Sequence, residues 1–592
     1  MNLFKYKISW IKKTGNRIRS FFRFPNKKKK FRGLNLDKKL VYDLSPSKIP
    51  NREQLKHLKR FLNPKEHLLI KICFLLIFIN AIYLGVVFLK KHLEYIPVPG
   101  GEYIEGVISY PQAINPLYSI NRDIDNDLSH LIYSSLFYYN EDGLLVPDLV
   151  EEMGVAENRI YTFKIRDGVK WHNGESLTVD DIIFTIEAIK NEDYRSPLYS
   201  SFNGVSIEKI DELTFKITLG SPYSPFLDLL TFGILPKSIW SKVNPSGAIL
   251  SEFNLKPVGS GPYKFKSLTK NKEGELKEYN LVVNDLYYTN KPYIKNIKFK
   301  FFVNYQEAIK ALNDNQIDGL GYLPFNERQE LFAQDSLSLH ELVRPQIFAI
   351  FFNSSKDKAL ADKGARVSLA QSLDRDALLR EVFDNVYQRA DGPILKNNFA
   401  YNHNIVPYDY NPEEAAVNIK NKLASTTLTV IDSGRNVLVA ENIKKQWENI
   451  GVSVELKVVS GEKASEIIKN RDFETLLYGE SVGGDPDIYS FWHSSQMKTN
   501  GLNIAGYNNT EADELLVAAR ETVNAEERII KYHKFQENIA SDLPVIFLYS
   551  PTYTYVQSKQ VKGFSGSVII RSADRFAGIS HWYLKTKIKL SW

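Results

Sequence analysis

The chain has 592 residues, a net charge of +7 and one cysteine. A single cysteine excludes an intrachain disulfide, so the folded part is stabilised by hydrophobic cores alone. The length exceeds what one core supports and indicates several domains.

Charge is distributed very unevenly along the chain. Residues 1–66 carry 20 Lys and Arg against four acidic residues, a net charge of +16, so residues 67–592 carry −9. Four consecutive lysines, Lys27 to Lys30, stand among scattered aromatic residues in this basic segment. Such a segment is typical of a largely disordered cytoplasmic tail that contacts anionic lipid. RNA binding is an alternative, because phosphate attraction needs only cationic density, but no specific nucleic-acid motif is present.

An apolar stretch from Leu68 to Leu89 separates the basic segment from the rest of the chain. As a helix, its residues extend roughly 33 Å, enough to cross a bilayer core of about 30 Å. We predict a transmembrane helix over 67–91, with a cytoplasmic N-terminus and the large acidic part outside the cell or in the periplasm, because basic flanks stay in the cytoplasm. A buried core helix and a secretory signal are the alternatives. A signal, however, has a much shorter basic region and a small-residue cleavage site.

The part that follows the apolar stretch begins with a short Pro- and Gly-containing tether over 92–101. From about residue 102 the chain alternates between strand-like and helix-like segments. In residues 161–165 and 214–219, apolar and polar side chains alternate, as in half-buried strands. In residues 181–190 and 441–450, apolar side chains recur with the period of an α-helix. This mixture predicts an α/β or α+β class.

Several blocks of the outer part occur in an order that resembles one family. The segment YTFKIRDGVKWHNGESLTVDDIIFTIEAIK (161–190) is similar to the signature of the family 5 extracellular solute-binding proteins, the peptide and nickel class of ABC-importer receptors. PVGSGPY (257–263), FAIFFNSS (348–355), GARVSLAQSLDRDALLREVF (364–383) and GDPDIYSFW (484–492) resemble later blocks of the same family. The order of these blocks makes the resemblance specific.

The resemblance implies an α/β fold of the two-lobed periplasmic-binding-protein type. Lobe I is expected over 102–345 and 546–592, and lobe II over 346–545. The chain would cross between them near Arg344-Pro345 and near Pro544-Val545, and these crossings would form a hinge that closes on ligand. The implied function is a membrane-anchored receptor that binds peptides or a similar small organic solute and works with ABC permease and ATPase subunits.

Two other classes of function were weighed against a receptor. A hydrolase is disfavoured, because the chain has no HExxH, CxxC, G-x-S-x-G or Walker pattern. His172, in the WHNG turn, is assigned a structural role, and we expect no catalytic residue, metal or cofactor. A tethered signalling or scaffold module that is not coupled to transport is the remaining alternative.

Candidate ligand-binding residues come from the positions that face the cleft in the family. Most lie in YGESVGGDPDIYSFW, where aromatic and carboxylate side chains are concentrated. Arg435, after a strand, is suited to a bidentate contact with a carboxylate. The predicted set is Asn115, Tyr118, Arg435, Tyr478, Glu480, Asp485, Asp487, Tyr489 and Trp492.

This sequence departs from the family at one position of that segment. Peptide-binding members commonly carry an aspartate three residues before the first Asp of the D-P-D motif, where it pairs with the ligand's α-amino group. Here that residue is Val482. Either Glu480 or Asp485 replaces the missing carboxylate, or the ligand has no free α-amine at that place.

Overall fold

The computed structural model describes Lys56 and residues 62–331, 335–406 and 408–590. The described residues divide into two units, one within the ranges Met1–Glu94 and Ile588–Trp592 and the other Tyr95–Lys587. Almost all of the basic segment 1–66 lies outside the described residues, so its predicted role as a lipid-binding tail stays a prediction.

The predicted apolar span forms a single helix, α5 (Pro64–His92), of 29 residues. Asn63 and Glu66 make reciprocal capping contacts at its start, and proline occupies its first position, where no intrahelical N–H bond is lost. Its one mid-span amide, Asn80, donates to the Leu76 carbonyl oxygen at 2.9 Å, so that polar group is satisfied within the helix. None of its residues is buried in the protein. By length and composition, α5 is able to cross a membrane.

The second unit contains a mixed seven-stranded sheet, in the order β13-β20-β12-β2-β11-β10-β9. Strand β2 pairs in parallel with both β11 and β12, whereas β20 runs antiparallel to β12 and β13. A strand from the end of the chain therefore fills the space between two earlier strands. The members are β2 (Glu102–Ile108), β9 (Tyr263–Lys270), β10 (Leu276–Val283), β11 (Asn296–Phe302), β12 (Gly319–Leu320), β13 (Leu337–Val343) and β20 (Thr552–Ser558).

A mixed six-stranded sheet forms the other large layer, in the order β15-β19-β14-β18-β16-β17. Each face of this sheet packs against its own hydrophobic core. Side chains along β14 point to the two faces in turn: Ile347, Ala349 and Phe351 lie in the core on one face, and Ile350 and Phe352 lie in the core on the other. Both faces of this sheet are therefore covered. The members are β14 (Gln346–Phe352), β15 (Gln388–Arg389), β16 (Ser425–Ile431), β17 (Ser453–Val459), β18 (Thr475–Ser481) and β19 (Val545–Ser550).

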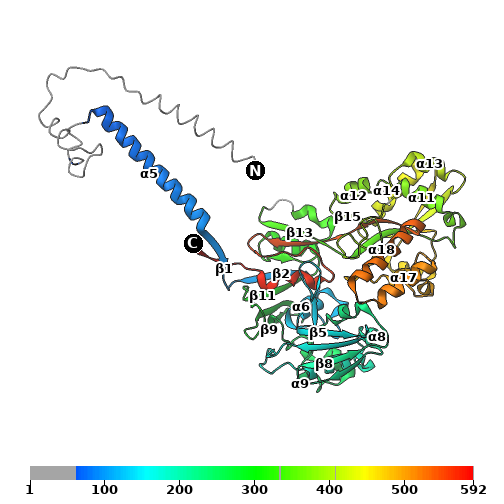
Figure 1. The fold of residues 1–592 in the computed structure, drawn as a ribbon, viewed down its shortest axis with the longest axis horizontal. Coiled ribbons are helices and arrows are strands. Elements are labelled where there is room, and N and C mark those ends of the chain that lie inside the picture. Colours follow the sequence, from blue (N-terminus) through cyan, green and yellow to red (C-terminus); the bar gives the residue numbers. More distant parts are fainter. Residues whose placement is uncertain (1–55, 57–61, 332–334, 407, 591–592) are drawn as a thin grey trace. The chain divides into compact units, whose positions relative to one another are not determined.

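Helices cover the two faces of the six-stranded sheet in separate groups. Helices α11 (Lys363–Gln371), α12 (Arg375–Phe383), α13 (Pro412–Ile419) and α14 (Asn436–Asn449) contribute to one core, and α16 (Tyr489–Trp492), α17 (Thr510–Glu521) and α18 (Ala525–Asp542) to the other. Helices α17 and α18 pack side by side (Figure 1). The remaining helix of this part is α15 (Gly461–Asn470).

A smaller antiparallel sheet, in the order β5-β6-β8-β7, packs into the same core as most of the seven-stranded sheet. The predicted strands at 161–165 and 214–219 are observed as β6 (Ile160–Ile165) and β8 (Thr214–Thr218), and the predicted helix at 181–190 is observed as α7 (Val179–Lys190). Thr178 and Asp181 form the expected capping box of α7. The other strands are β5 (Val150–Ala156) and β7 (Ser206–Lys209), and β3 (Phe137–Tyr139) pairs with β4 (Leu145–Pro147).

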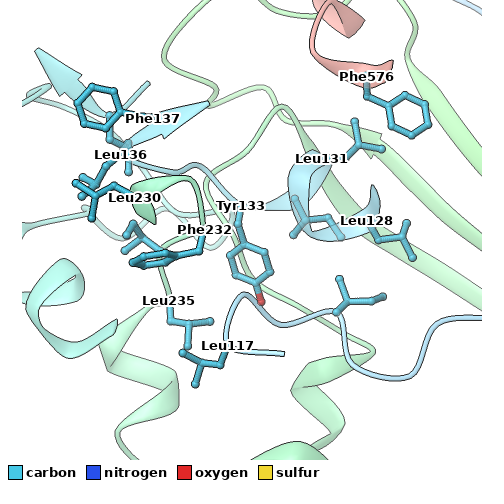
Figure 2. Close-up of a cluster of buried hydrophobic side chains, with 14 of the residues drawn as sticks. Leu117, Leu128, Leu131, Tyr133, Leu136, Phe137, Leu230, Phe232, Leu235 and Phe576 are labelled. Carbon is cyan, nitrogen blue, oxygen red and sulfur yellow. The ribbon is translucent and has the colours of Figure 1, made fainter. Parts of the chain in front are cut away.

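The core beneath these sheets gathers residues that are distant in sequence. Leu128 and Leu131 of α6 (Asp123–Ile132) lie near Phe576 from the last part of the chain, and Leu230 and Phe232 lie close to the hairpin residues 136–137 (Figure 2). Further helices of this region are α8 (Tyr199–Phe202), α9 (Lys237–Trp240) and α10 (Tyr305–Asn313).

The chain passes from one large sheet to the other at two places. The first is at Arg344 and Pro345, between β13 and β14, where a crossing is predicted. The second is at Pro551, between β19 and β20, and not at Pro544-Val545. Residues 546–550 therefore belong to the six-stranded sheet. The prediction was wrong here because all of β19 is buried and pairs with β14, which a sequence pattern does not reveal.

Candidate functional site

A cavity lies beside the first chain crossing, where loops from the two parts of the chain that carry the large sheets meet. Three segments line it: the β3–β4 turn at 142–144, the loop after β15 at 393–399 and the loop after β18 at 482–488, together with Pro345, Val568 and Ile570. Its volume is about 60 Å³. Of the predicted site residues, Asp485 is the only one among the described lining residues.

The two sides of this cavity touch at a glycine. A Cβ atom added to Gly484 would lie 2.6 Å from Ile570 and 2.9 Å from Tyr139, which belong to the side of the seven-stranded sheet. A side chain at this position would require Ile570 and Tyr139 to move. Asn398 fixes the loop from the other direction, because its Nδ2 donates to the Gly484 carbonyl oxygen at 3.0 Å.

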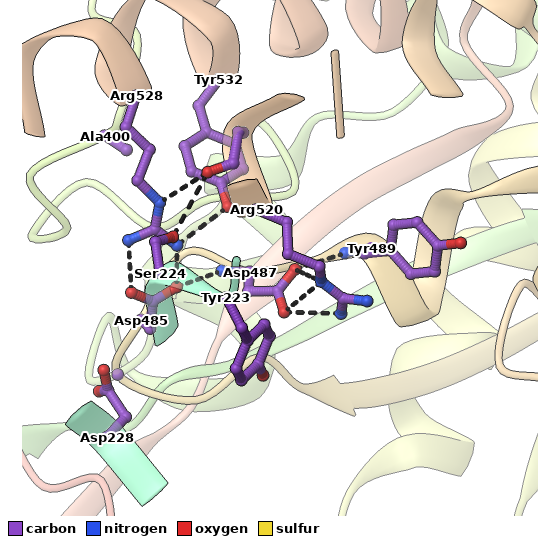
Figure 3. Close-up of polar contacts among 12 residues, drawn as sticks. Tyr223, Ser224, Asp228, Ala400, Asp485, Asp487, Tyr489, Arg520, Arg528 and Tyr532 are labelled. Carbon is purple, nitrogen blue, oxygen red and sulfur yellow. Dashed lines mark hydrogen bonds and ion pairs between the residues drawn. The ribbon is translucent and has the colours of Figure 1, made fainter. Parts of the chain in front are cut away.

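The two aspartates of the D-P-D motif each form an ion pair with an arginine (Figure 3). Arg528 of α18 contacts both carboxylate oxygens of Asp485, one of them at 2.6 Å through Nη1. Arg520 of α17 donates to Asp487 through Nε at 3.1 Å and Nη2 at 2.7 Å. Burial lowers the pKa of Arg528, but the contacts with Asp485 and Tyr532 together raise it by more, so the net direction is upward and the guanidinium stays charged.

The two ion pairs are faced from the other part of the chain by the segment η3 (Ser224–Leu230) and by Tyr223, which precedes it. Ser224 Oγ donates to the Ala519 carbonyl oxygen at 3.4 Å, and the Arg520 guanidinium lies 5.4 Å from the centre of the Tyr223 ring. Asp228 accepts a hydrogen bond from Tyr139. Burial, and then the negative charge of Asp485, raise the pKa of Asp228 to about 6. Figure 3 shows Tyr223, Ser224 and Asp228 beside the two ion pairs.

Glu480 differs from the two aspartates because none of the described residues forms a hydrogen bond with its Oε1. Its side chain is 8% exposed, and burial raises the pKa of this carboxyl well above its usual range. Position 480 of β18 pairs with Ile347 of β14. Tyr478, two residues earlier, is half-buried and makes an edge contact with Phe351.

Tyr489 and Trp492 have different environments. The Tyr489 ring lies 4.0 Å from the Arg520 guanidinium and supports the ion pair to Asp487. Trp492 is a core residue, 2% exposed, that packs against Tyr507 and Phe535. Its burial explains why an aromatic residue in this motif does not line the cavity.

The predicted residues outside this motif lie away from the cavity. Asn115 is fully buried, donates to Asn254 at 3.0 Å and accepts from the Leu117 N–H at 2.9 Å, a structural role. Tyr118 is buried, and its hydroxyl has no partner among the described residues. Burial raises the pKa of Tyr118 to about 12.

Arg435 makes contacts that no sequence pattern indicated. It donates to Asn326 at 2.9 Å and to the Val382 carbonyl oxygen at 2.7 Å, and it lies 4.5 Å above the Phe325 ring. Phe325, from the segment between β12 and β13, packs against Phe383 of α12. Arg435 therefore ties that segment to the six-stranded sheet and its helices.

Two other cavities, of about 350 and 250 Å³, surround His130 and Tyr133. Their described lining comes mainly from α6, the β3–β4 hairpin, nearby loops and the segment at 571–581, and includes no residue of the six-stranded sheet. The described residues contain no group of three or more His, Cys, Asp or Glu arranged to hold a metal ion.

Two helix-covered sheets, two chain crossings and a cavity beside the first crossing define a two-lobed binding protein. Residues 145–502, more than half of the chain, match the bacterial extracellular solute-binding proteins, family 5 (middle region). The chain belongs to this family.

Relatives and solved structures agree with this assignment. The chain is 29% identical to the oligopeptide-binding protein AppA of Bacillus subtilis over 497 residues, 79% of this chain and 89% of AppA. It is 24% identical to the dipeptide-binding protein of Escherichia coli, over 77% of this chain and 90% of that protein. The structure of Bacillus subtilis AppA with a nonapeptide matches with a TM-score of 0.62 at 27% identity, over 83% of this chain and 100% of that one. The substrate-binding protein CtaP of Listeria monocytogenes matches with a TM-score of 0.72 at 25% identity, over 82% and 99%.

Proposed function

We propose that this protein is a membrane-anchored receptor that binds a peptide or a similar small organic solute between its lobes and passes it to the permease and ATPase of an ABC importer. The observation that carries the proposal is the cavity beside the chain crossing at Pro345, where loops from the two parts of the chain that carry the large sheets meet. Two relatives of this protein are named as an oligopeptide-binding and a dipeptide-binding protein.

The sheets support a division into lobes that differs slightly from the predicted one. Lobe I comprises 102–345 and the chain after Ser550, and lobe II comprises 346–550. Both crossings are short segments between strands: a bend at Arg344-Pro345, where the Gln346 N–H donates to the Arg344 carbonyl oxygen at 2.7 Å, and the single residue Pro551. A few residues at the ends of elements are enough to absorb the dihedral changes of a hinge.

Ligand binding is expected to bring the two lobes together and to stabilise the protein. Mass spectrometry of ligand retained by the purified protein identifies a compound to add back. That compound should reduce the radius of gyration in solution scattering and raise the melting temperature, because a ligand that prefers the folded, closed state stabilises it by mass action. A bound ligand that leaves the radius of gyration unchanged contradicts the hinge.

Helix α5 supports anchoring, with the basic segment in the cytoplasm and the lobes outside. Tethering keeps the receptor at a high effective concentration beside its permease. Protease added to intact cells should digest the chain after Lys91 and spare residues 1–66. Protection of the C-terminal part would exclude this orientation, and a purified protein that lacks residues 1–91 would identify α5 as a cleaved signal.

A further inference from the structure

The cavity between the lobes has an apolar lining. Its larger apolar side chains include Leu144, Ile394, Phe399, Val482, Val568 and Ile570. Two of them are open to solvent on opposite sides: Leu144 is 58% exposed and Phe399 is 50% exposed. Exposing large apolar side chains to water is unfavourable. Binding of an apolar ligand group over Leu144 and Phe399 would remove part of their surface from water and so favour the complex.

Charge is nearly absent from the same lining. Asp142 and Asp485 are the only charged residues among its described members. Asp142 lies at the exposed tip of the β3–β4 turn. Asp485 faces the cavity, but both of its oxygens are already bonded to Arg528, which is 5% exposed. This pair leaves no net charge at the wall.

The neighbouring carboxylates are also unavailable to a ligand in this cavity. Asp487 is held by Arg520 through two donors. Glu480 is buried and is not part of the lining. The backbone N–H of Val482 is bonded to the Pro345 carbonyl oxygen at 2.9 Å, so the residue presents its apolar side chain. Asp142, at the exposed edge of the lining, is the one carboxylate that the described contacts do not pair. An ammonium group placed on the other side, against Val482, would be desolvated without a carboxylate beside it to compensate its charge, which is very costly.

We infer that this cavity, with its volume of about 60 Å³, receives a small, uncharged, apolar part of a peptide-like ligand, such as a short aliphatic side chain or the acetyl group of a blocked N-terminus, and excludes a free α-ammonium group. The inference rests on the proposed function and adds a specificity to it. Val482, Leu144 and Phe399 are the residues that determine this specificity.

Two peptide libraries that differ only at the N-terminus test the inference. One consists of tetrapeptides with a free α-amine, the other of the same tetrapeptides acetylated, and each is incubated with the full-length protein in detergent. Retained peptides are then measured by mass spectrometry. We expect the acetylated library to be retained at least as well as the free one, with enrichment of short aliphatic residues over aromatic ones, because the cavity is too small for an aromatic ring. Retention of the free library alone overturns the inference and leaves the receptor function standing. Retention of neither overturns the peptide-receptor function, and the inference with it.

Substitutions in the lining connect the result to this cavity. Val482→Asp should shift preference toward the free library by about tenfold or more, the scale of a new charge-assisted contact, whereas Val482→Asn should not. Leu144→Ser and Phe399→Ala should each weaken retention of the acetylated library about tenfold. Leu250→Ser is the matched control, because Leu250 is 88% exposed and does not line the cavity. Unchanged preference in Val482→Asp, in a protein with an unaltered melting temperature, overturns the inference.

Discussion

Replacing Arg575 by methionine is expected to lower the free energy of unfolding by about 3–5 kcal/mol, the scale for removing one partner from a buried ionic network. Arg575 is 2% exposed and donates to both oxygens of Asp127, at 2.8 Å and 2.5 Å. Its Nε donates to Glu105 at 3.0 Å. The substitution would leave two buried carboxylates without their cation.

Urea denaturation of the full-length protein in detergent, followed by tryptophan fluorescence, measures the effect. Lys356→Met is the matched control, because Lys356 is paired with Asp472 at 2.7 Å but both side chains are about half exposed. An exposed pair of this kind contributes about 0–1 kcal/mol. Equal losses in the two variants would show that the Arg575 network does not stabilise the fold.

Replacing Gly259 by alanine is expected to cost at least about 3 kcal/mol, at the upper end of the range for overpacking a core. A Cβ atom at this position would lie 1.9 Å from the carbonyl oxygen of Ile132 and 2.7 Å from its carbonyl carbon. Both are backbone atoms at the end of α6, so rotation of a side chain cannot relieve the clash. The same turn is held by Gly261, whose N–H donates to the Ile132 carbonyl oxygen at 2.8 Å.

The comparison that isolates this clash is Gly154→Ala in β5, where an added Cβ meets no atom within 4 Å. We expect Gly154→Ala to leave the denaturation midpoint nearly unchanged or to raise it, because alanine restricts the unfolded chain. A Gly259→Ala protein as stable as Gly154→Ala would mean that the end of α6 moves freely, contrary to the packing described.

Secondary-structure elements with a clear local sequence pattern were predicted correctly. Strand β6 alternates buried and half-buried residues, and α7 begins at a Thr178–Asp181 capping box, so short-range information was sufficient for both. His172 also has the structural role assigned to it. It accepts from the Gly259 N–H at 3.1 Å and contacts the Gly261 carbonyl oxygen at 3.3 Å, and burial lowers its pKa to about 4.

Long-range pairing limited the prediction of the site. The sequence drew attention to Asp485 and Asp487, but their partners Arg528 and Arg520 lie on helices more than thirty residues later, at spacings of 43 and 33. No local pattern indicates which arginine meets which carboxylate. For the same reason, the motif did not distinguish Trp492, which fills a core, from Val482, which lines the cavity.

The position of β20 has a consequence for the order in which the protein is made and folded. This strand enters between β12 and β13, which are synthesised more than two hundred residues earlier. Until Thr552–Ser558 arrives, β13 lacks its only sheet neighbour and β12 keeps one open edge, and open edges of this kind invite pairing with other chains. Contacts between such distant segments form slowly, because a long loop must close first. Lobe I is therefore completed last although most of it is synthesised first, and a truncation before residue 552 would leave its sheet open to aggregation.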